Sequence, residues 1–181
     1  MNKLALALAT SALALSIPLS PAFATIETYE AKSAALEAAD QAREDMAEVF
    51  GNKQLKPGQY VWRDGVTDGA PRVIISLSDQ MAYLYRGDRL AAVSTVSTGT
   101  DKNPTPTGIF PILAKKTMHH SKKYDNAPMP HMQRLDKYGI ALHAGFNPGR
   151  PASHGCIRLP AKFAAKLYGV TEIGSTVFIA A

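Results

Sequence analysis

Apolar residues recur along this chain with two different periods, and the first period is helical. Residues 25–50 place acidic side chains between apolar positions that repeat at steps of three and four: Leu36, Ala39, Ala42, Met46, Val49 and Phe50. This period predicts one helix, and Gly51 stands where a left-handed residue usually ends a helix. Because the apolar stripe is narrow and largely alanine, we expect the helix to lie along the body of the protein or to pair with another chain.

From residue 71 the pattern changes to that of β-strands. Short apolar segments are separated by turn residues: "RVIISLS" (72–78), "MAYLYR" (81–86), "IFPILAKK" (109–116) and "TVFIA" (176–180). A further short strand is expected after the turn at residues 57–58. Several short strands with turns between them are typical of an all-β sandwich or barrel rather than of βαβ units. We therefore predict a mainly β fold.

Two segments depart from the strand pattern. "PAKFAAKLYG" (160–169) begins with proline and ends with glycine, which frames a helix whose inner face holds Phe163 and Leu167. Residues 117–137 have no usable periodicity and are long for a connection in a compact domain. They mix methionine and tyrosine with lysine and arginine. This composition predicts a lid over an amphipathic anionic ligand, and the alternative is a merely mobile loop.

The first 24 residues have the form of a secretion signal. Lys3 precedes an apolar run over residues 4–17, and the segment closes on Ala-Phe-Ala, the small-x-small form that signal peptidase cuts. A transmembrane anchor is the alternative, but the run is short and is interrupted by serine and proline. We predict that the mature protein starts at Thr25, is exported to the periplasm and keeps no membrane anchor.

Charge is distributed unevenly along the chain. Residues 25–50 carry seven acidic and two basic side chains, whereas residues 51–181 carry eight acidic and 17 Lys and Arg side chains. A basic body outside the cytoplasm indicates an anionic partner such as a cell-wall polymer or lipid head groups. Nucleic acid is a poor candidate in that compartment. The alternative is a soluble basic surface without a specific partner.

The only cysteine, Cys156, lies in the segment "SHGCIR", between His154 and Arg158. One cysteine cannot form an intrachain disulfide, so it is an inert buried thiol, an intermolecular link or a reactive group. A reactive thiolate needs a base or a positive environment nearby. The segment "YGIALH" predicts a strand that ends at His143, and a loop rich in glycine and proline then returns the chain toward the cysteine.

The residues around Cys156 predict an oxyanion site and an unusual partner for the histidine. The backbone N–H groups of Gly155 and Cys156 are expected to point at a developing oxyanion. No acidic residue lies between His143 and Cys156. Any group that orients the histidine is therefore expected to be a backbone carbonyl rather than the aspartate of a conventional triad.

The segment "HAGFNPGRPASHGCIRLP" resembles the signature of the L,D-transpeptidases, also called the YkuD family. In that signature a histidine and a short variable stretch precede Ser/Thr-His-Gly-Cys, a hydrophobic residue and Asn/Arg. The segments "RVIISLSDQMAYLYRGDRL", "VSTG" and "TPTGIF" are similar to the opening hairpin and the turns of that family. The resemblance covers about residues 71–180.

The resemblance implies a β-sandwich catalytic domain with a lid loop over residues 71–180. The N-terminal helix and linker over residues 25–70 match nothing expected of that domain, and their role is open. It makes Cys156 the nucleophile and His143 its base. The backbone at Gly155 and Cys156 would form the oxyanion hole. Substrate-binding residues are expected in the pocket and the lid: Ser153, His154, Arg158, Tyr124, Met129 and His131. One departure is that the gap from His143 to Ser153 is shorter than in many members.

The activity that the resemblance implies is cross-linking of peptidoglycan stem peptides through a cysteine thioester, without metal or cofactor. It further implies that carbapenems acylate Cys156. One alternative is an L,D-carboxypeptidase, or an enzyme that attaches or cleaves a wall-linked protein, with the same site. A zinc hydrolase would use His143, His154 and Cys156, although His-x-Cys is not a usual zinc spacing. A wall-binding module without catalysis is the third. No feature of the sequence predicts the oligomeric state.

Overall fold

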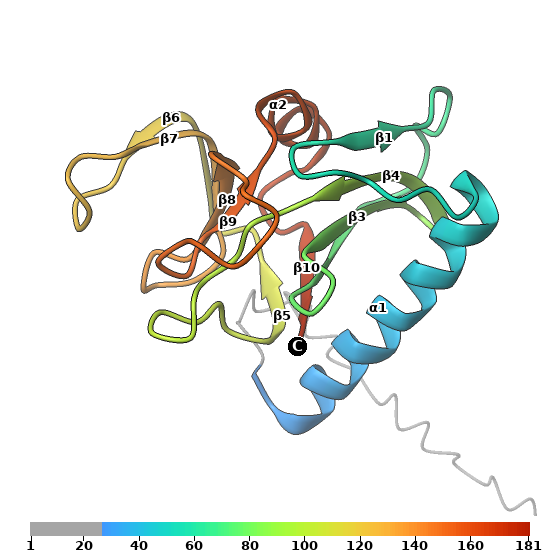
Figure 1. Cartoon of the computed structure of the whole chain (residues 1–181), viewed down its shortest axis with the longest axis horizontal. Helices are drawn as coiled ribbons and strands as arrows, with labels where there is room; N and C mark the ends of the chain where they lie inside the picture. The colour runs from blue at the N-terminus through green and yellow to red at the C-terminus, as the bar shows by residue number, and fades with distance from the viewer. Residues whose placement is uncertain (1–26) are drawn as a thin grey trace, which may run out of the picture.

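The structure is a computed structural model that describes residues 27–181, and its strands form two β-sheets (Figure 1). The predicted secretion signal, residues 1–24, lies outside the described residues. One sheet has the order β1-β4-β3-β2-β10-β5 and consists of β1 (Tyr60–Trp62), β2 (Pro71–Ser76), β3 (Met81–Arg86), β4 (Arg89–Thr95), β5 (Gly108–Pro111) and β10 (Thr176–Ala180). The other has the order β6-β7-β8-β9 and consists of β6 (Ala114–His120), β7 (Pro128–Arg134), β8 (Ala141–Ala144) and β9 (Ile157–Leu159).

Two helices complete the described fold, α1 (Tyr29–Phe50) and α2 (Ala161–Val170). The mainly β fold with an N-terminal helix is thus confirmed, as is the helix after Pro160. Phe163 and Leu167 of α2 are fully buried, as the sequence predicts. No helix in residues 27–181 is long and apolar enough to cross a membrane.

The six-stranded sheet is buried on both faces. Along β2, Val73 and Ile75 pack into the core between the two sheets, whereas Ile74 packs against α1. A strand that is covered on both sides reads as a continuous apolar run, which is the pattern of "RVIISLS". The core between the sheets is completed by large side chains from the second sheet, α2 and β5: Leu142, Ile157, Leu159, Phe163, Leu167 and Phe110.

Helix α1 covers the outer face of the six-stranded sheet (Figure 1). Its buried residues are all alanines: Ala31, Ala35, Ala39 and Ala42. The predicted apolar stripe is therefore wrong in part, because Leu36 and Val49 are 44% and 36% exposed. The reason is that the sheet supplies the bulk, since Tyr83 and Tyr85 of β3 pack against the alanine positions. Small side chains let the helix approach that surface closely.

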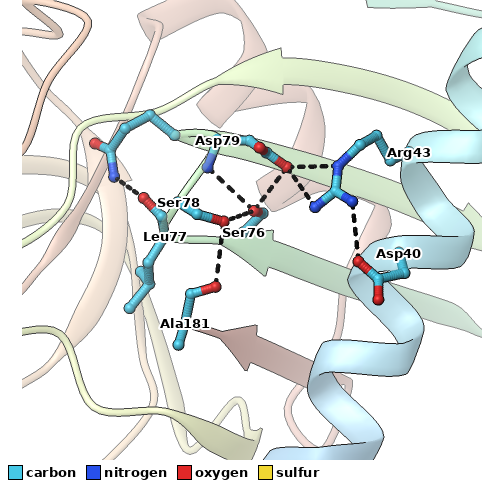
Figure 2. Close-up of polar contacts among 8 residues, drawn as sticks. Asp40, Arg43, Ser76, Leu77, Ser78, Asp79 and Ala181 are labelled. Carbon is cyan, nitrogen blue, oxygen red and sulfur yellow. Dashed lines mark hydrogen bonds and ion pairs between the residues drawn. The ribbon is translucent and has the colours of Figure 1, made fainter.

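Polar contacts fix α1 on the sheet. The Tyr85 hydroxyl donates to the Asp45 carboxylate at 2.5 Å. Figure 2 shows the guanidinium of Arg43 between Asp40 of the same helix and Asp79 in the turn after β2. The Arg43 and Asp79 side chains are 50% and 33% exposed, so we expect their ion pair to add well under about 1 kcal/mol to stability. Alanine packing dominates this interface.

The second sheet departs from the predicted strands and lid in two ways. "IFPILAKK" is not one strand, because it supplies the end of β5 to one sheet and the start of β6 to the other. Residues 117–137 are not a long loop, because most of them belong to the β6–β7 hairpin and only residues 121–127 connect its strands. Prolines at 128 and 130 hide the strand pattern. They are tolerated because β7 pairs with β8 only at residues 133 and 134, so β7 has a free edge near the prolines.

Two strand pairs are parallel, which the sequence does not predict. β10 lies in the interior of its sheet, parallel to β2 and antiparallel to β5. β8 and β9 are parallel, with Leu142 opposite Ile157 and His143 opposite Arg158. The second pair places the histidine and cysteine segments side by side.

The packing of α1 yields a test of stability. Replacing the buried Ala39 by leucine forces extra methylene groups between α1 and the sheet, so Ala39→Leu is expected to lower the free energy of unfolding by about 1–3 kcal/mol. Leu36→Ala, on the half-exposed side of the same helix, is the matched control and should cost less than about 1 kcal/mol. Urea unfolding of residues 25–181 measures both, and the reverse order would contradict this packing.

Candidate active site around Cys156

The parallel pair of β8 and β9 puts the histidine and the cysteine on one face of the second sheet. Leu142, Ala144, Ile157 and Leu159 all point into the core. Because side chains alternate along a strand, Cys156, Arg158 and His143 lie on the opposite face. Arg158 is directly across from His143, and Cys156 precedes Arg158 by two positions, just before the paired Ile157. Strand spacing and rise put the Cα atoms of His143 and Cys156 about 8 Å apart, a distance that their two side chains together can span.

His143 is held in one tautomer. Its Nδ1 lies 2.8 Å from the backbone carbonyl of Ala144. A carbonyl can only accept, so Nδ1 carries the proton and Nε2 keeps its lone pair. The orienting group is thus a backbone carbonyl, as the sequence predicts. Burial lowers the pKa of His143, which the nearby charge of Arg158 reinforces and the Ala144 bond opposes. The ring is therefore neutral at pH 7 and able to accept a proton.

Cys156 is partly exposed and sits in a mixed environment. Its side chain packs against Met129, Met132 and Ala141, and its thiol donates to the Gly139 carbonyl at 3.6 Å. Burial raises the pKa of Cys156, and Asp136 adds to this, whereas the Ala141 N–H and the Arg158 charge oppose it. At pH 7 the resting pair is therefore a neutral thiol and a neutral imidazole.

Asp136, which is not among the residues predicted for the site, shapes the turn that contacts the thiol. One carboxylate oxygen accepts from the backbone N–H groups of Tyr138, Gly139 and Ile140 at 2.8–2.9 Å. These bonds fold residues 136–140 so that the Gly139 carbonyl faces Cys156. The signal was present as Asp-x-x-Gly, since an aspartate commonly accepts from N–H groups two and three residues onward in a turn.

Residues 152–156, here called the cysteine loop, are held in part by the side chain of Ser153. Ser153 is 2% exposed. Its hydroxyl donates to the Cys156 carbonyl at 2.5 Å and accepts from the Gly155 N–H at 3.1 Å. The Gly155 N–H, which the sequence places in the oxyanion hole, therefore already has an acceptor. The Ser153 side chain is therefore buried against the backbone of the loop and does not line an open pocket.

The turns "VSTG" and "TPTG" hold this loop in place. The Thr105 hydroxyl accepts from the Gly99 N–H at 2.9 Å and donates to the Gly155 carbonyl at 2.8 Å. A Cβ on Gly99 would lie 2.9 Å from the Gly155 Cα, and a Cβ on Gly155, where φ is +108°, would lie 2.7 Å from Ile140. Both positions therefore require glycine. Thr105 and Gly99 join the site as support for the loop.

The predicted substrate contacts divide between the two faces of the sheet. In the connection between β6 and β7, the Tyr124 ring stacks on the exposed His154 ring at 4.2 Å between centroids. Met129 lies in the cluster with Cys156. The His131 ring instead lies 5.6 Å from that of Tyr168 on α2, on the side away from Cys156. Met129 and Arg158 thus lie near Cys156, Tyr124 contacts His154 of the same segment, and His131 contacts α2 instead.

A zinc site has no geometric support in this part of the chain. Within residues 27–181, no three His, Cys, Asp or Glu side chains are grouped as ligands of one metal ion would be. His154 stacks on Tyr124, and His143 uses one ring nitrogen on a backbone carbonyl.

Comparisons with known proteins agree on one family. Residues 70–179 match the family model of the L,D-transpeptidase catalytic domain, YkuD. The chain is 26% identical over 162 residues to a YkuD protein of Bacillus licheniformis, an alignment that covers 84% of this chain and 93% of that protein.

Solved structures show the same fold. An L,D-transpeptidase (Yku) from Stackebrandtia nassauensis is 26% identical and superposes with a TM-score of 0.57, over 75% of this chain and 64% of that one. An L,D-transpeptidase from Mycobacterium smegmatis is 21% identical with a TM-score of 0.56, over 61% and 58% of the two chains. The chain thus spans less than two thirds of either solved protein.

The neutral resting pair predicts how the thiol responds to pH. Since the pKa of Cys156 is raised above the ordinary 9.0, the thiolate fraction at pH 8 is smaller in the folded protein than in the unfolded chain. Alkylation by iodoacetamide, which consumes the thiolate, should be slower for folded protein at pH 8. Its rate should climb about tenfold per pH unit until above pH 9. The urea-unfolded protein is the control, and a folded-state plateau below pH 9 would refute the neutral thiol.

The bridging hydroxyl of Thr105 yields a second test. Thr105→Val keeps the shape but leaves the Gly99 N–H and the Gly155 carbonyl without this partner, which should cost about 1–3 kcal/mol of stability. Thr67→Val is the control, because that hydroxyl bonds only to an exposed aspartate and should change stability by less than about 0.5 kcal/mol. Thermal unfolding measures both variants. Equal unfolding midpoints for the two would show that the Thr105 hydroxyl does not stabilise the loop.

Proposed function

The chain belongs to the family of L,D-transpeptidase (YkuD) catalytic domains, and on this basis we propose that it joins peptidoglycan stem peptides through a thioester on Cys156. The observation that supports this most directly is the pairing of β8 with β9. It places a neutral histidine with a free Nε2 on the same face as the only thiol of the chain.

In the first half-reaction His143 Nε2 takes the proton of Cys156, and the thiolate attacks the carbonyl on the L-configured side of an L,D peptide bond. The Ala144 carbonyl then stabilises the imidazolium through Nδ1. We assign the oxyanion to the Cys156 N–H, because the Gly155 N–H donates to Ser153. The C–N bond breaks, the imidazolium protonates the departing D-amino acid, and a thioester remains.

In the second half-reaction an amine of a neighbouring stem attacks the thioester. His143 accepts the proton of that amine, the C–S bond breaks, and the resulting amide is the cross-link. A thioester suits this route because it survives in water long enough for an amine to compete. Arg158 lies beside both reacting side chains, so its guanidinium is a suitable partner for a stem carboxylate. Tyr124 and Met129 would line the substrate side.

The proposed substrate requires export. Residues 1–24 have the sequence of a secretion signal, and the basic body suits an anionic wall. N-terminal sequencing of the protein recovered from the periplasm is expected to begin at Thr25. Recovery of uncleaved chain from the cytoplasm alone would argue against this location.

The nucleophile can be tested directly with a carbapenem. Exposure of residues 25–181 to imipenem is expected to give a one-to-one adduct in intact-mass spectrometry, as a covalent step at Cys156 requires. Cys156→Ala should give no adduct. His143→Ala should form it about 100- to 10,000-fold more slowly, since that is the usual contribution of a general base. An adduct that persists in Cys156→Ala would place the reaction at another residue.

Transfer and hydrolysis are separated by the acceptor. A purified tetrapeptide stem is incubated with enzyme in the presence and absence of a second stem that carries a free side-chain amine. Cross-linked dimer that forms only with this acceptor supports transpeptidation. Loss of the terminal D-residue without dimer in either mixture would instead support an L,D-carboxypeptidase.

A further inference from the structure

Gln80 occupies an unusual position in the turn between β2 and β3. Its φ is +54°, in the left-handed region where glycine or asparagine is favoured and a longer side chain is disfavoured. The residue is nevertheless nearly buried, with 9% of its surface exposed. A disfavoured backbone at a buried glutamine indicates that the side chain has a role which a glycine could not supply.

The whole amide of Gln80 is used in hydrogen bonds. Its Nε2 donates to the Leu77 carbonyl at 2.7 Å and to the Thr98 hydroxyl at 2.6 Å. Its Oε1 accepts from the Thr98 N–H at 3.1 Å. Both the nitrogen and the oxygen of the Gln80 amide therefore bond to Thr98, which lies 18 positions later in the sequence.

Thr98 in turn is hydrogen-bonded to the cysteine loop. Its carbonyl accepts from the backbone N–H groups of Ala152 and Ser153, both at 2.9 Å. Ser153 then donates its hydroxyl to the Cys156 carbonyl and receives the Gly155 N–H. The path from Gln80 to the backbone of Cys156 therefore consists of hydrogen bonds between buried groups, with Thr98 and Ser153 as its two intermediate residues.

The turn that contains Gln80, where this path begins, is also held by hydrogen bonds. Figure 2 shows the turn residues Ser76, Ser78 and Asp79 joined by hydrogen bonds, with Asp79 receiving Arg43 from α1 and Ser78 contacting the Ala181 carbonyl. The Gln80 carbonyl itself accepts from the Val96 N–H at 2.8 Å. The turn is therefore a rigid base for the Gln80 side chain.

We propose that Gln80 is a positioning residue for the acyl transfer, which sets the height and orientation of the Cys156 backbone through Thr98 and Ser153. This inference rests on the proposed function. Gln80 makes no contact with the thiol, whose own neighbours are Gly139, Met129, Met132 and Ala141. It therefore acts on the geometry of attack and of the oxyanion donor, not on the ionisation of the sulfur.

Gln80→Gly separates this role from a purely structural one. Glycine suits the left-handed backbone, so the variant is expected to stay folded, but it removes all three hydrogen bonds of the amide. We expect the rate constant of imipenem acylation at saturation to fall between about 10- and 100-fold, as displacement of a reacting group near 1 Å does. The imipenem concentration at half-saturation should change less than about twofold. Gln80→Glu, which keeps the length but loses the Nε2 donor, should show the same split.

The controls distinguish the possible failures. Thr67→Val is the control and should acylate at the wild-type rate, because the Thr67 hydroxyl contacts neither this turn nor Thr98. Iodoacetamide alkylation of Cys156, which needs the thiolate but no precise attack geometry, should be unchanged in both Gln80 variants at temperatures where circular dichroism shows them folded.

Wild-type acylation rates in folded Gln80→Gly and Gln80→Glu would overturn the role of Gln80 and leave the proposed function intact. A parallel loss of acylation and alkylation would also overturn it, because that would mean a general disturbance of the site. Absence of any imipenem adduct on the wild-type protein would count against the proposed function itself.

Discussion

Two backbones meet at the base of the cysteine loop, and the close approach of Gly99 to Gly155 decides where that loop lies. Neither position has room for a Cβ. The Thr105 hydroxyl connects the two segments, because it accepts from the Gly99 N–H and donates to the Gly155 carbonyl. The loop is therefore placed by contacts with segments about 50 residues earlier, rather than by strand β9 alone. Its two ends are fixed by backbone bonds, so the cysteine between them has little freedom.

The second sheet separates packing from chemistry by its two faces. One face of β8 and β9 is apolar and fully buried, which anchors the strands, and the other carries His143, Arg158 and the adjoining Cys156. His143 and Cys156 both rest in their neutral forms, which avoids the cost of burying an ion pair. In the proposed reaction the Ala144 carbonyl would stabilise the imidazolium of His143, and the positive charge of Arg158 would stabilise the thiolate of Cys156.

The parts of this fold that could be read from sequence are those that depend on local pattern. The helices, the β-rich body and the His/Cys pair follow from periodicity and a dense motif. The loop predicted over residues 117–137 is wrong as secondary structure, because prolines at 128 and 130 interrupt the strand pattern of β7. The parallel pairing of β8 with β9 depends on long-range contacts. Gln80 and Asp136 carry no signal beyond their turns, since their importance arises from what the fold brings to them.

The described catalytic domain also depends on a helix outside the family match. That match begins at residue 70, yet the outer face of its six-stranded sheet presents Ile74, Tyr83, Tyr85, Leu90 and Val93, which are buried beneath α1. Uncovered, these side chains would form a contiguous apolar surface of the kind that soluble monomers avoid. The alanine face of α1 closes this surface, and Arg43 reaches the turn that carries Gln80. The N-terminal helix is therefore part of the same folded unit as the cysteine site.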